Sequence, residues 1–170
     1  TAVWGTDDSF DLLARVQGQQ WSRAYDINDR NVVVGTVMPR NGTAGAVAWP
    51  APHEARWLAG NNTSFRLGEA NAVSDAGVIV GFGHAQATDP ASAFRWTRGE
   101  GMHALSGAQT IAYDVNEAGQ AVGLSGSSAV IWEANGTMRG LGNLPGGGAS
   151  DLQGGRINSR IVAARSSSAR

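Results

Sequence analysis

The sequence predicts an all-β protein built from repeats, and three observations lead to this prediction. A hairpin-like segment recurs along the chain, a tryptophan and a leucine recur behind it at one spacing, and no stretch shows a convincing helical apolar period. The composition agrees with short strands and tight turns, because 42 % of the residues are hydrophobic and 24 are glycine.

The first recurring segment carries a β-branched residue, a small polar turn and then an apolar run. Asn and Asp side chains bond to their own backbone in such turns, and Gly or Asn accepts a positive φ, so each copy predicts an antiparallel hairpin. Three clear copies and a worn fourth copy occur, at residues 26–35, 72–81, 114–123 and 156–165.

The second recurring segment is a short apolar run that ends in tryptophan and is followed nine residues later by leucine. It predicts a second hairpin, and Asn135-Gly136 is a strong turn signal within one copy. Because the tryptophans are in register, we expect them to be packing residues. The pairs are Trp4 with Leu13, Trp49 with Leu58, Trp96 with Leu105 and Trp132 with Leu141.

The two ends of the chain carry complementary halves of this repeat. A whole repeat holds four strands in ~42 residues, close to the length of a WD40-like blade, and stacked blades bury one another's faces. We therefore predict a four-bladed β-propeller with a composite blade closed by the N- and C-terminal half-repeats; a β-sandwich or a barrel of hairpins is the alternative. The single repeat domain, residues 1–170, divides into 1–16 with 154–170, then 24–60, 70–107 and 112–143.

The repeat resembles the HAF family, a group of bacterial extracellular repeats. Residues 24–35 and 112–123 match its Ala-x-x-Ile-Asn-x-x-Gly-x-Val-Val-Gly part, and residues 92–96 match its His-Ala-Phe-x-Trp-like run. No copy has the His-Ala-Phe triplet itself, Ser74 replaces the usual Asn, and Arg165 replaces the last Gly. The resemblance implies secretion or surface display in a bacterium and no particular reaction. We expect an extracellular or cell-surface protein without its signal peptide, and the start at Thr1 fits this expectation as it fits a trimmed chain.

Several classes of function are disfavoured by the residues. The net charge of −1 provides no basic field for nucleic acid, and no apolar run approaches the ~20 residues that cross a bilayer. Cysteine is absent, the three histidines have no metal spacing, and no Gly-x-Ser-x-Gly elbow occurs. Asp26-x-Asn28 and Asp114-x-Asn116 faintly resemble calcium loops, but Ala72 stands at the equivalent position of another copy, which favours structural turns. We expect no metal, no cofactor and no catalysis.

Ligand contacts are sought among residues that break the repeat, because the scaffold does not demand them. Trp21 is such a residue, and aromatic side chains stack on sugars and fill interface pockets, although a cavity filler is the alternative. We expect it in a variable loop, on the propeller face where loop length differs between copies. The candidate ligand-binding residues are Trp21, Arg40, Arg66 and His84.

These observations favour a non-enzymatic extracellular binding module that presents variable loops to a glycan or a protein. A self-assembling structural protein of a surface layer or fibre is the second hypothesis, because a ring can stack on itself. A hydrolase with a site in the central channel is the third.

Overall fold

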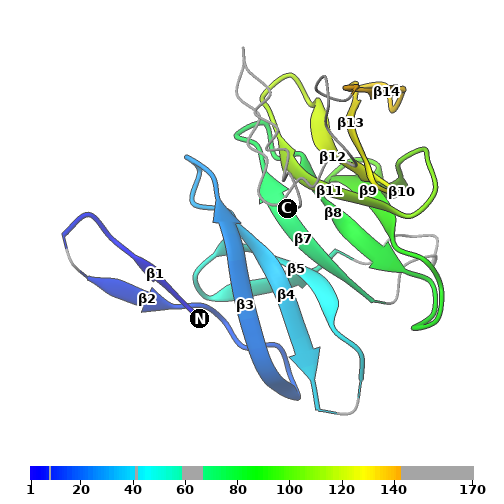
Figure 1. The fold of residues 1–170 in the computed structure, drawn as a ribbon. Coiled ribbons are helices and arrows are strands. Elements are labelled where there is room, and N and C mark those ends of the chain that lie inside the picture. The colour runs from blue at the N-terminus through cyan, green and yellow to red at the C-terminus, as the bar shows by residue number, and fades with distance from the viewer. Residues whose placement is uncertain (8, 41, 59–66, 143–170) are drawn as a thin grey trace, which may run out of the picture.

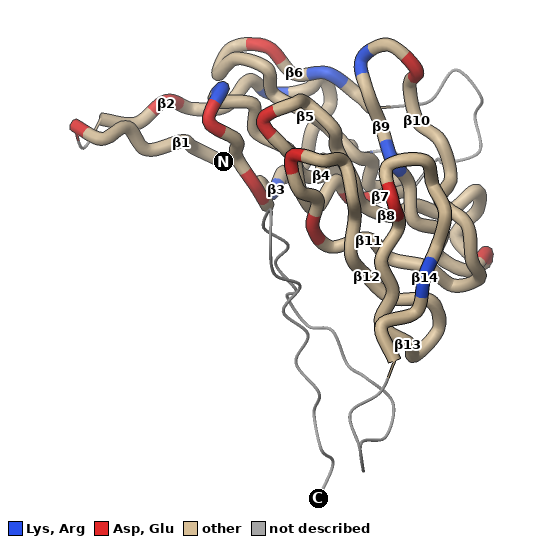
Figure 2. Tube along the Cα trace, turned by 90° about the horizontal axis from the view of Figure 1, so that it is seen from above, with Lys and Arg blue, Asp and Glu red and all other residues tan. Residues whose placement is uncertain are grey.

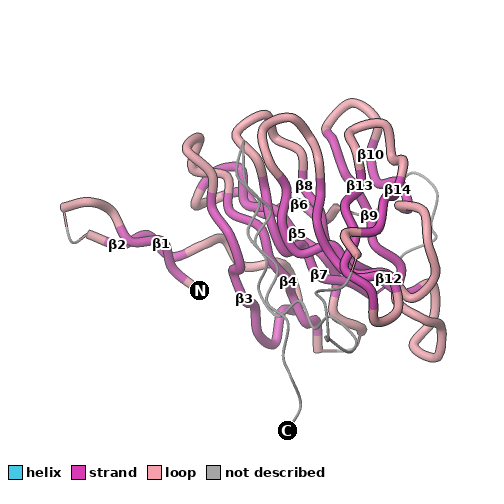
Figure 3. The backbone as a smooth tube through the Cα atoms, turned by 45° about the horizontal axis from the view of Figure 1, so that its top comes forward, coloured by secondary structure: helices cyan, strands magenta, loops and turns pink. Residues whose placement is uncertain are grey.

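The computed structural model describes residues 1–7, 9–40, 42–58 and 67–142, and this part of the chain contains strands and turns but no helix (Figure 3). The all-β prediction is therefore confirmed. Within the described residues no helix is long and apolar enough to cross a membrane. The strands are β1 (Ala2–Trp4), β2 (Phe10–Leu12), β3 (Gln19–Ile27), β4 (Val33–Pro39), β5 (Gly45–Ala51), β6 (Glu54–Trp57), β7 (Leu67–Val73), β8 (Ile79–His84), β9 (Ser92–Thr97), β10 (Gly101–Ala104), β11 (Thr110–Val115), β12 (Ala121–Ser125), β13 (Ser128–Trp132) and β14 (Met138–Gly140).

Twelve of these strands form three antiparallel sheets of four, each in sequence order, which lie side by side (Figure 1). We call them sheet 1 (β3–β6), sheet 2 (β7–β10) and sheet 3 (β11–β14). Each sheet falls on one of the predicted repeats, and the first strand of a sheet packs against the sheet before it: β7 lies against β3, β4 and β5, and β11 against β7, β8 and β9.

A backbone irregularity explains the glycine that ends the first half-repeat in sheets 1, 2 and 3. The first strand of every sheet has a β-bulge opposite this glycine, which adds one residue and pushes the strand's backbone toward it. A Cβ atom on the glycine would lie only 1.9 Å from a carbonyl oxygen of the bulged strand, so no other residue fits without a backbone shift. The glycines and the carbonyls are Gly35 with Arg23, Gly81 with Glu69, and Gly123 with Ile111.

The predicted polar turns between the first two strands also join neighbouring sheets. Asn28 Nδ2 donates to the Ser74 carbonyl oxygen at 2.9 Å, and the Asp29 N–H donates to the Asp75 carboxylate at 2.7 Å. In the same way, the Asp75 N–H donates to the Glu117 carboxylate at 2.7 Å. Polar groups of one turn are thus satisfied by the next turn, which fixes the spacing between the sheets.

The N-terminal strands β1 and β2 form a separate two-stranded hairpin that projects from sheet 1 (Figure 1). The hairpin has the hydrogen bond of the other second half-repeats, since Leu13 N–H donates to the Thr1 carbonyl oxygen as Leu58 N–H does to that of Ala46. The hairpin is also joined to the following sheet by the same kind of hydrogen bond. The Trp49 indole N–H donates to the Ala14 carbonyl oxygen at 2.9 Å, as that of Trp132 does to Ser106 at 2.8 Å.

The hydrophobic core shows which in-register tryptophans are packing residues. Trp49 and Trp132 are fully buried, and Trp96 is partly buried against the cluster between sheets 1 and 2. Trp4 differs from the prediction, because its side chain is 71 % exposed. In the described part of the chain the β1–β2 hairpin pairs with no further strand, so only Phe10 stacks on the Trp4 ring, at 5.2 Å between centroids. The other half of the predicted composite blade, within 154–170, lies outside the described residues.

Candidate ligand-binding cleft

A concave cleft of about 410 Å³ lies between sheets 1 and 2, at the end of the strands where each sheet has its two hairpin turns. The β3–β4 turn and strands β5 and β6 form one wall. The β7–β8 and β9–β10 turns form the other. Its volume is in the range of small-ligand pockets, about 300–1,000 Å³.

The interior of the cleft is apolar. Val32 and Pro50 line it from sheet 1, and Val73, Ile79 and Trp96 line it from sheet 2. Val32 and Trp96 also pack against the buried cluster between the two sheets, so this surface is continuous with the core. Such a surface is held rigid by core packing, and a ligand does not need to order it.

The cleft also carries positive charge. Three lining residues are arginines: Arg30 from the β3–β4 turn, Arg56 from β6 and Arg98 from the β9–β10 turn. No lining residue is an Asp, Glu or His. Arg56 pairs with Glu54 at 2.7 Å, but both side chains are substantially exposed and such a pair is weak. Within the described ranges, Arg30 and Arg98 form no ion pair. Figure 2 shows the basic positions of β6 and of the β9–β10 hairpin on the same side of the trace.

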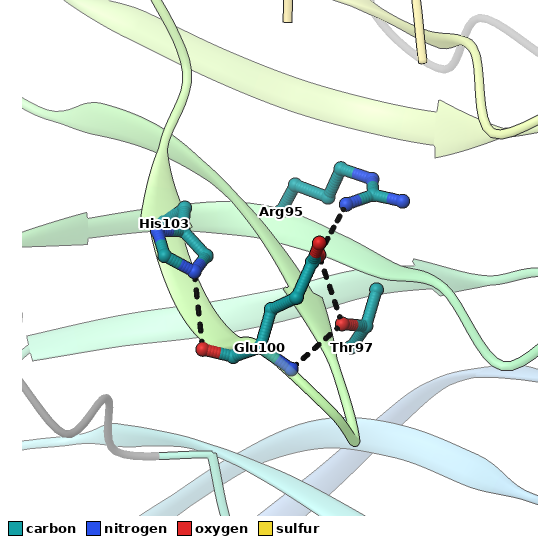
Figure 4. Close-up of polar contacts among 4 residues, drawn as sticks. All are labelled: Arg95, Thr97, Glu100 and His103. Carbon is teal, nitrogen blue, oxygen red and sulfur yellow. Dashed lines mark hydrogen bonds and ion pairs between the residues drawn. The ribbon is translucent and has the colours of Figure 1, made fainter. Parts of the chain in front are cut away.

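The turn that carries Arg98 is held by a cluster of polar contacts (Figure 4). The Glu100 carboxylate accepts from Thr97 Oγ1 at 3.1 Å and from Arg95 Nη1 at 3.0 Å, and Glu100 N–H donates back to Thr97 Oγ1. The Thr97 hydroxyl first, and Arg95 second, lower the pKa of Glu100 from its ordinary value of 4.5. These contacts join the residues on both sides of Arg98 and so fix the backbone position of Arg98 in the turn.

The turn that carries Arg30 is fixed in another way. Asn28 Oδ1 accepts from the N–H groups of Arg30 at 3.1 Å and Val32 at 2.9 Å, which is the local side-chain bonding expected of Asn in a turn. Asn31 takes the left-handed conformation that the turn requires, with φ of 59°. Since Asn28 is buried and also bonds to Ser74 of sheet 2, the two walls of the cleft are tied together.

The ligand-binding residues predicted from the sequence lie outside this cleft. Trp21 is within β3 and not in the expected loop, because the β3–β4 ladder extends to Gln19 and Pro39. The residue is 38 % exposed, and its ring centroid already lies 5.4 Å from the guanidinium of Arg23. Arg40 follows β4, and its N–H donates to the Gly18 carbonyl oxygen, so it lies near the Trp21 end of the same hairpin.

His84 is the last residue of β8 in sheet 2, and its Nδ1 lies 2.7 Å from the Asp89 carbonyl oxygen. Arg66 lies outside the described residues. Trp21, Arg40 and His84 are at the opposite end of the strands from the cleft and none of them lines it. The structure thus brings Trp21 and Arg40 to one hairpin and leaves His84 on another sheet.

A signal for the cleft was present in the sequence. Arg30 departs from the repeat at two of the three equivalent positions, since alanine stands at 76 and 118, whereas the worn fourth copy also has an arginine, Arg160. Arg98 breaks it too, since alanine stands two residues after Trp49 and after Trp132. A search for arginines that stand where other copies have alanine would have found both.

Other ionisable side chains show no further catalytic or metal-binding cluster in the described part of the chain. Among the described residues, no group of three or more His, Cys, Asp or Glu side chains is placed to hold a metal ion. The Asp26 carboxylate accepts from the Val73 N–H of the next sheet, and His103 Nε2 lies 3.0 Å from the Glu100 carbonyl oxygen.

A comparison with protein-family models, curated proteins and solved structures gave no match to this chain. The site therefore rests on the geometry of this chain.

Proposed function

We propose that this chain is a non-enzymatic binding module that recognises a glycan or a protein outside the cell. The observation that carries the proposal is the cleft between sheets 1 and 2, which combines apolar walls, three arginines and two pre-formed turns. Its lining contains no carboxylate or imidazole to act as a general base, and the permanently charged guanidinium cannot serve as one. Binding is the function that such a surface supports best.

The proposed scaffold is a four-bladed β-propeller. Its support is the packing of each first strand on the preceding sheet, together with the β1–β2 hairpin, which is related to sheet 1 as the β9–β10 hairpin is related to sheet 3. Residues 154–170 would supply the other half of that fourth blade. The resemblance to HAF repeats supports export from a bacterial cell and remains part of the proposal.

The loop-bearing end is the second place at which a ligand could bind on this scaffold. The β4–β5 and β8–β9 loops share that end, where Trp21 offers a partly exposed ring. We favour the cleft, because it is enclosed by two sheets, whereas the Trp21 ring has Arg23 as a neighbour.

An array of glycans, followed by a capture experiment with extracellular proteins, tests the proposed function. We expect saturable binding of at least one class by a monodisperse monomer, without turnover of the bound molecule. A polymer whose size grows with concentration would instead favour the structural protein. Cleavage of an arrayed glycan or ester would favour the hydrolase.

A further inference from the structure

We infer that the cleft between sheets 1 and 2 binds an acidic saccharide, with a sugar ring against Trp96 and a carboxylate held between Arg30 and Arg98. This inference rests on the proposed binding function and names the class of ligand. It places the ligand at the end of the strands opposite the variable loops.

The sign of the charge in the cleft identifies the ligand as an anion. The whole chain has 13 basic and 14 acidic residues, so a surface chosen at random would be close to neutral. The cleft lining holds three arginines and no acidic side chain. Low-dielectric apolar walls strengthen the field of these charges, because they exclude the water that would screen them.

The type of basic residue points to a carboxylate. A guanidinium presents N–H donors in a planar fork that matches the two oxygens of a carboxylate, and it is hydrated more weakly than an ammonium group. Arg30 and Arg98 come from turns on opposite walls and hold no carboxylate of the described chain. Arg56 adds a third guanidinium, whose exposed partner Glu54 can be displaced at little cost.

The apolar walls suit the ring of a sugar. A pyranose has a face of C–H groups, and an indole is the side chain best suited to pack against such a face. Trp96 lines the cleft together with Val32 and Pro50 from the opposite wall, so the indole lies within an apolar surface. An acidic peptide would gain much of its affinity by adding a strand along an open sheet edge such as β6, without need of the indole, so its binding is a separate outcome of the test.

Calorimetric titration of the folded chain with trigalacturonate tests the inference. Its methyl ester, which has the same rings without the charge, is the matched ligand control. We expect the acid to bind and the ester to bind at least tenfold more weakly. Arg98→Gln and Arg30→Gln should each weaken binding of the acid by about tenfold or more, whereas Arg40→Gln, at the other end of the strands, should leave it unchanged. The binding of the acid should also weaken with added salt.

Each other outcome overturns a distinct claim. If Arg40→Gln and Trp21→Ala weaken binding while Arg30→Gln and Arg98→Gln do not, the ligand is at the loop-bearing end; the proposed function stands and the inference fails. Equal affinity for acid and ester, or binding of a glutamate-rich peptide in place of the acid, also refutes the inference alone. Failure of every arrayed glycan and every captured protein to bind refutes the proposed function itself. Unchanged melting temperatures show that each variant remains folded.

Discussion

The β1–β2 and β5–β6 hairpins have the same sequence pattern and the same local hydrogen bond, but their tryptophans have opposite environments. Trp49 of β5 is fully buried, whereas Trp4 of β1 is 71 % exposed. The difference comes from neighbours, because β5 is paired with both β4 and β6 in a four-stranded sheet, whereas within the described residues β1 is paired with β2 alone. The repeat thus specifies the hairpin locally, and burial of its tryptophan depends on the sheet around it.

The largest predicted effect is the loss of a fully buried tryptophan. Trp49→Ala should lower the free energy of unfolding by about 3–5 kcal/mol, because it removes a large core side chain and leaves a cavity. Trp96→Ala should cost less, since Trp96 is only partly buried. Denaturant unfolding of the two variants measures both. Equal losses, or a loss below about 1 kcal/mol for Trp49→Ala, would contradict the burial assigned here.

The second prediction concerns the glycine opposite the bulge. Gly81→Ala should destabilise the fold by about 1–3 kcal/mol or more, because the added Cβ would lie 1.9 Å from the Glu69 carbonyl oxygen and force the strands apart. Gly140→Ala is the matched control, since a Cβ there meets nothing within 4 Å. The measurement is again the free energy of unfolding. If the two substitutions cost the same, the bulge in β7 is not what requires the glycine.

The sequence predicted the features that repeat and missed those that arise between repeats. The hairpins and the recurring glycine at position 81 could be predicted, because both depend on residue spacings within a single repeat. Trp21 was placed in a loop, because the extra pairing of β3 with Met38 and Pro39 depends on a partner strand that the turn signals do not show. The cleft was missed for a similar reason: Arg30 and Arg98 are distant in sequence and come together only when sheets 1 and 2 pack.

The third prediction uses Trp4 to test the composite blade. If residues 154–170 complete that blade, they cover the β1–β2 hairpin, and Trp4→Ala should cost about 1–3 kcal/mol in the full chain. In a chain lacking residues 154–170, the same substitution should cost less than about 0.5 kcal/mol, as expected of an exposed residue. The free energies of unfolding of the two chain lengths, each with and without Trp4→Ala, give the coupling between Trp4 and residues 154–170. The same small cost in both backgrounds would rule out the proposed closure.

The smallest predicted effect compares the turns of a packed and of a projecting hairpin at low pH. The Ser9 hydroxyl lowers the pKa of Asp7 in the β1–β2 turn, and the Thr97 hydroxyl and Arg95 lower that of Glu100 in the β9–β10 turn. A lowered pKa means that the folded turn favours the ionised carboxylate. Its contribution is therefore complete above the ordinary pKa, 3.8 for Asp7 and 4.5 for Glu100, and is lost as the pH falls through the folded value.

Both carboxylates are exposed, so the loss should leave the global fold intact and act locally. The β9–β10 turn remains packed through Met102 and Leu105, so below pH 4.5 we expect the NMR signals of Thr97 and Glu100 to shift while the amide protons of this hairpin stay protected. In the described part of the chain the β1–β2 hairpin pairs with no further strand, and Val3 packs against the buried cluster of sheet 1. Its amide protons should therefore exchange faster once Asp7 is protonated. Glu100→Gln and Asp7→Asn should each abolish the pH dependence at their own turn. Equal protection of the two hairpins at low pH would mean that β1–β2 is as well covered as β9–β10, which would favour the closed composite blade.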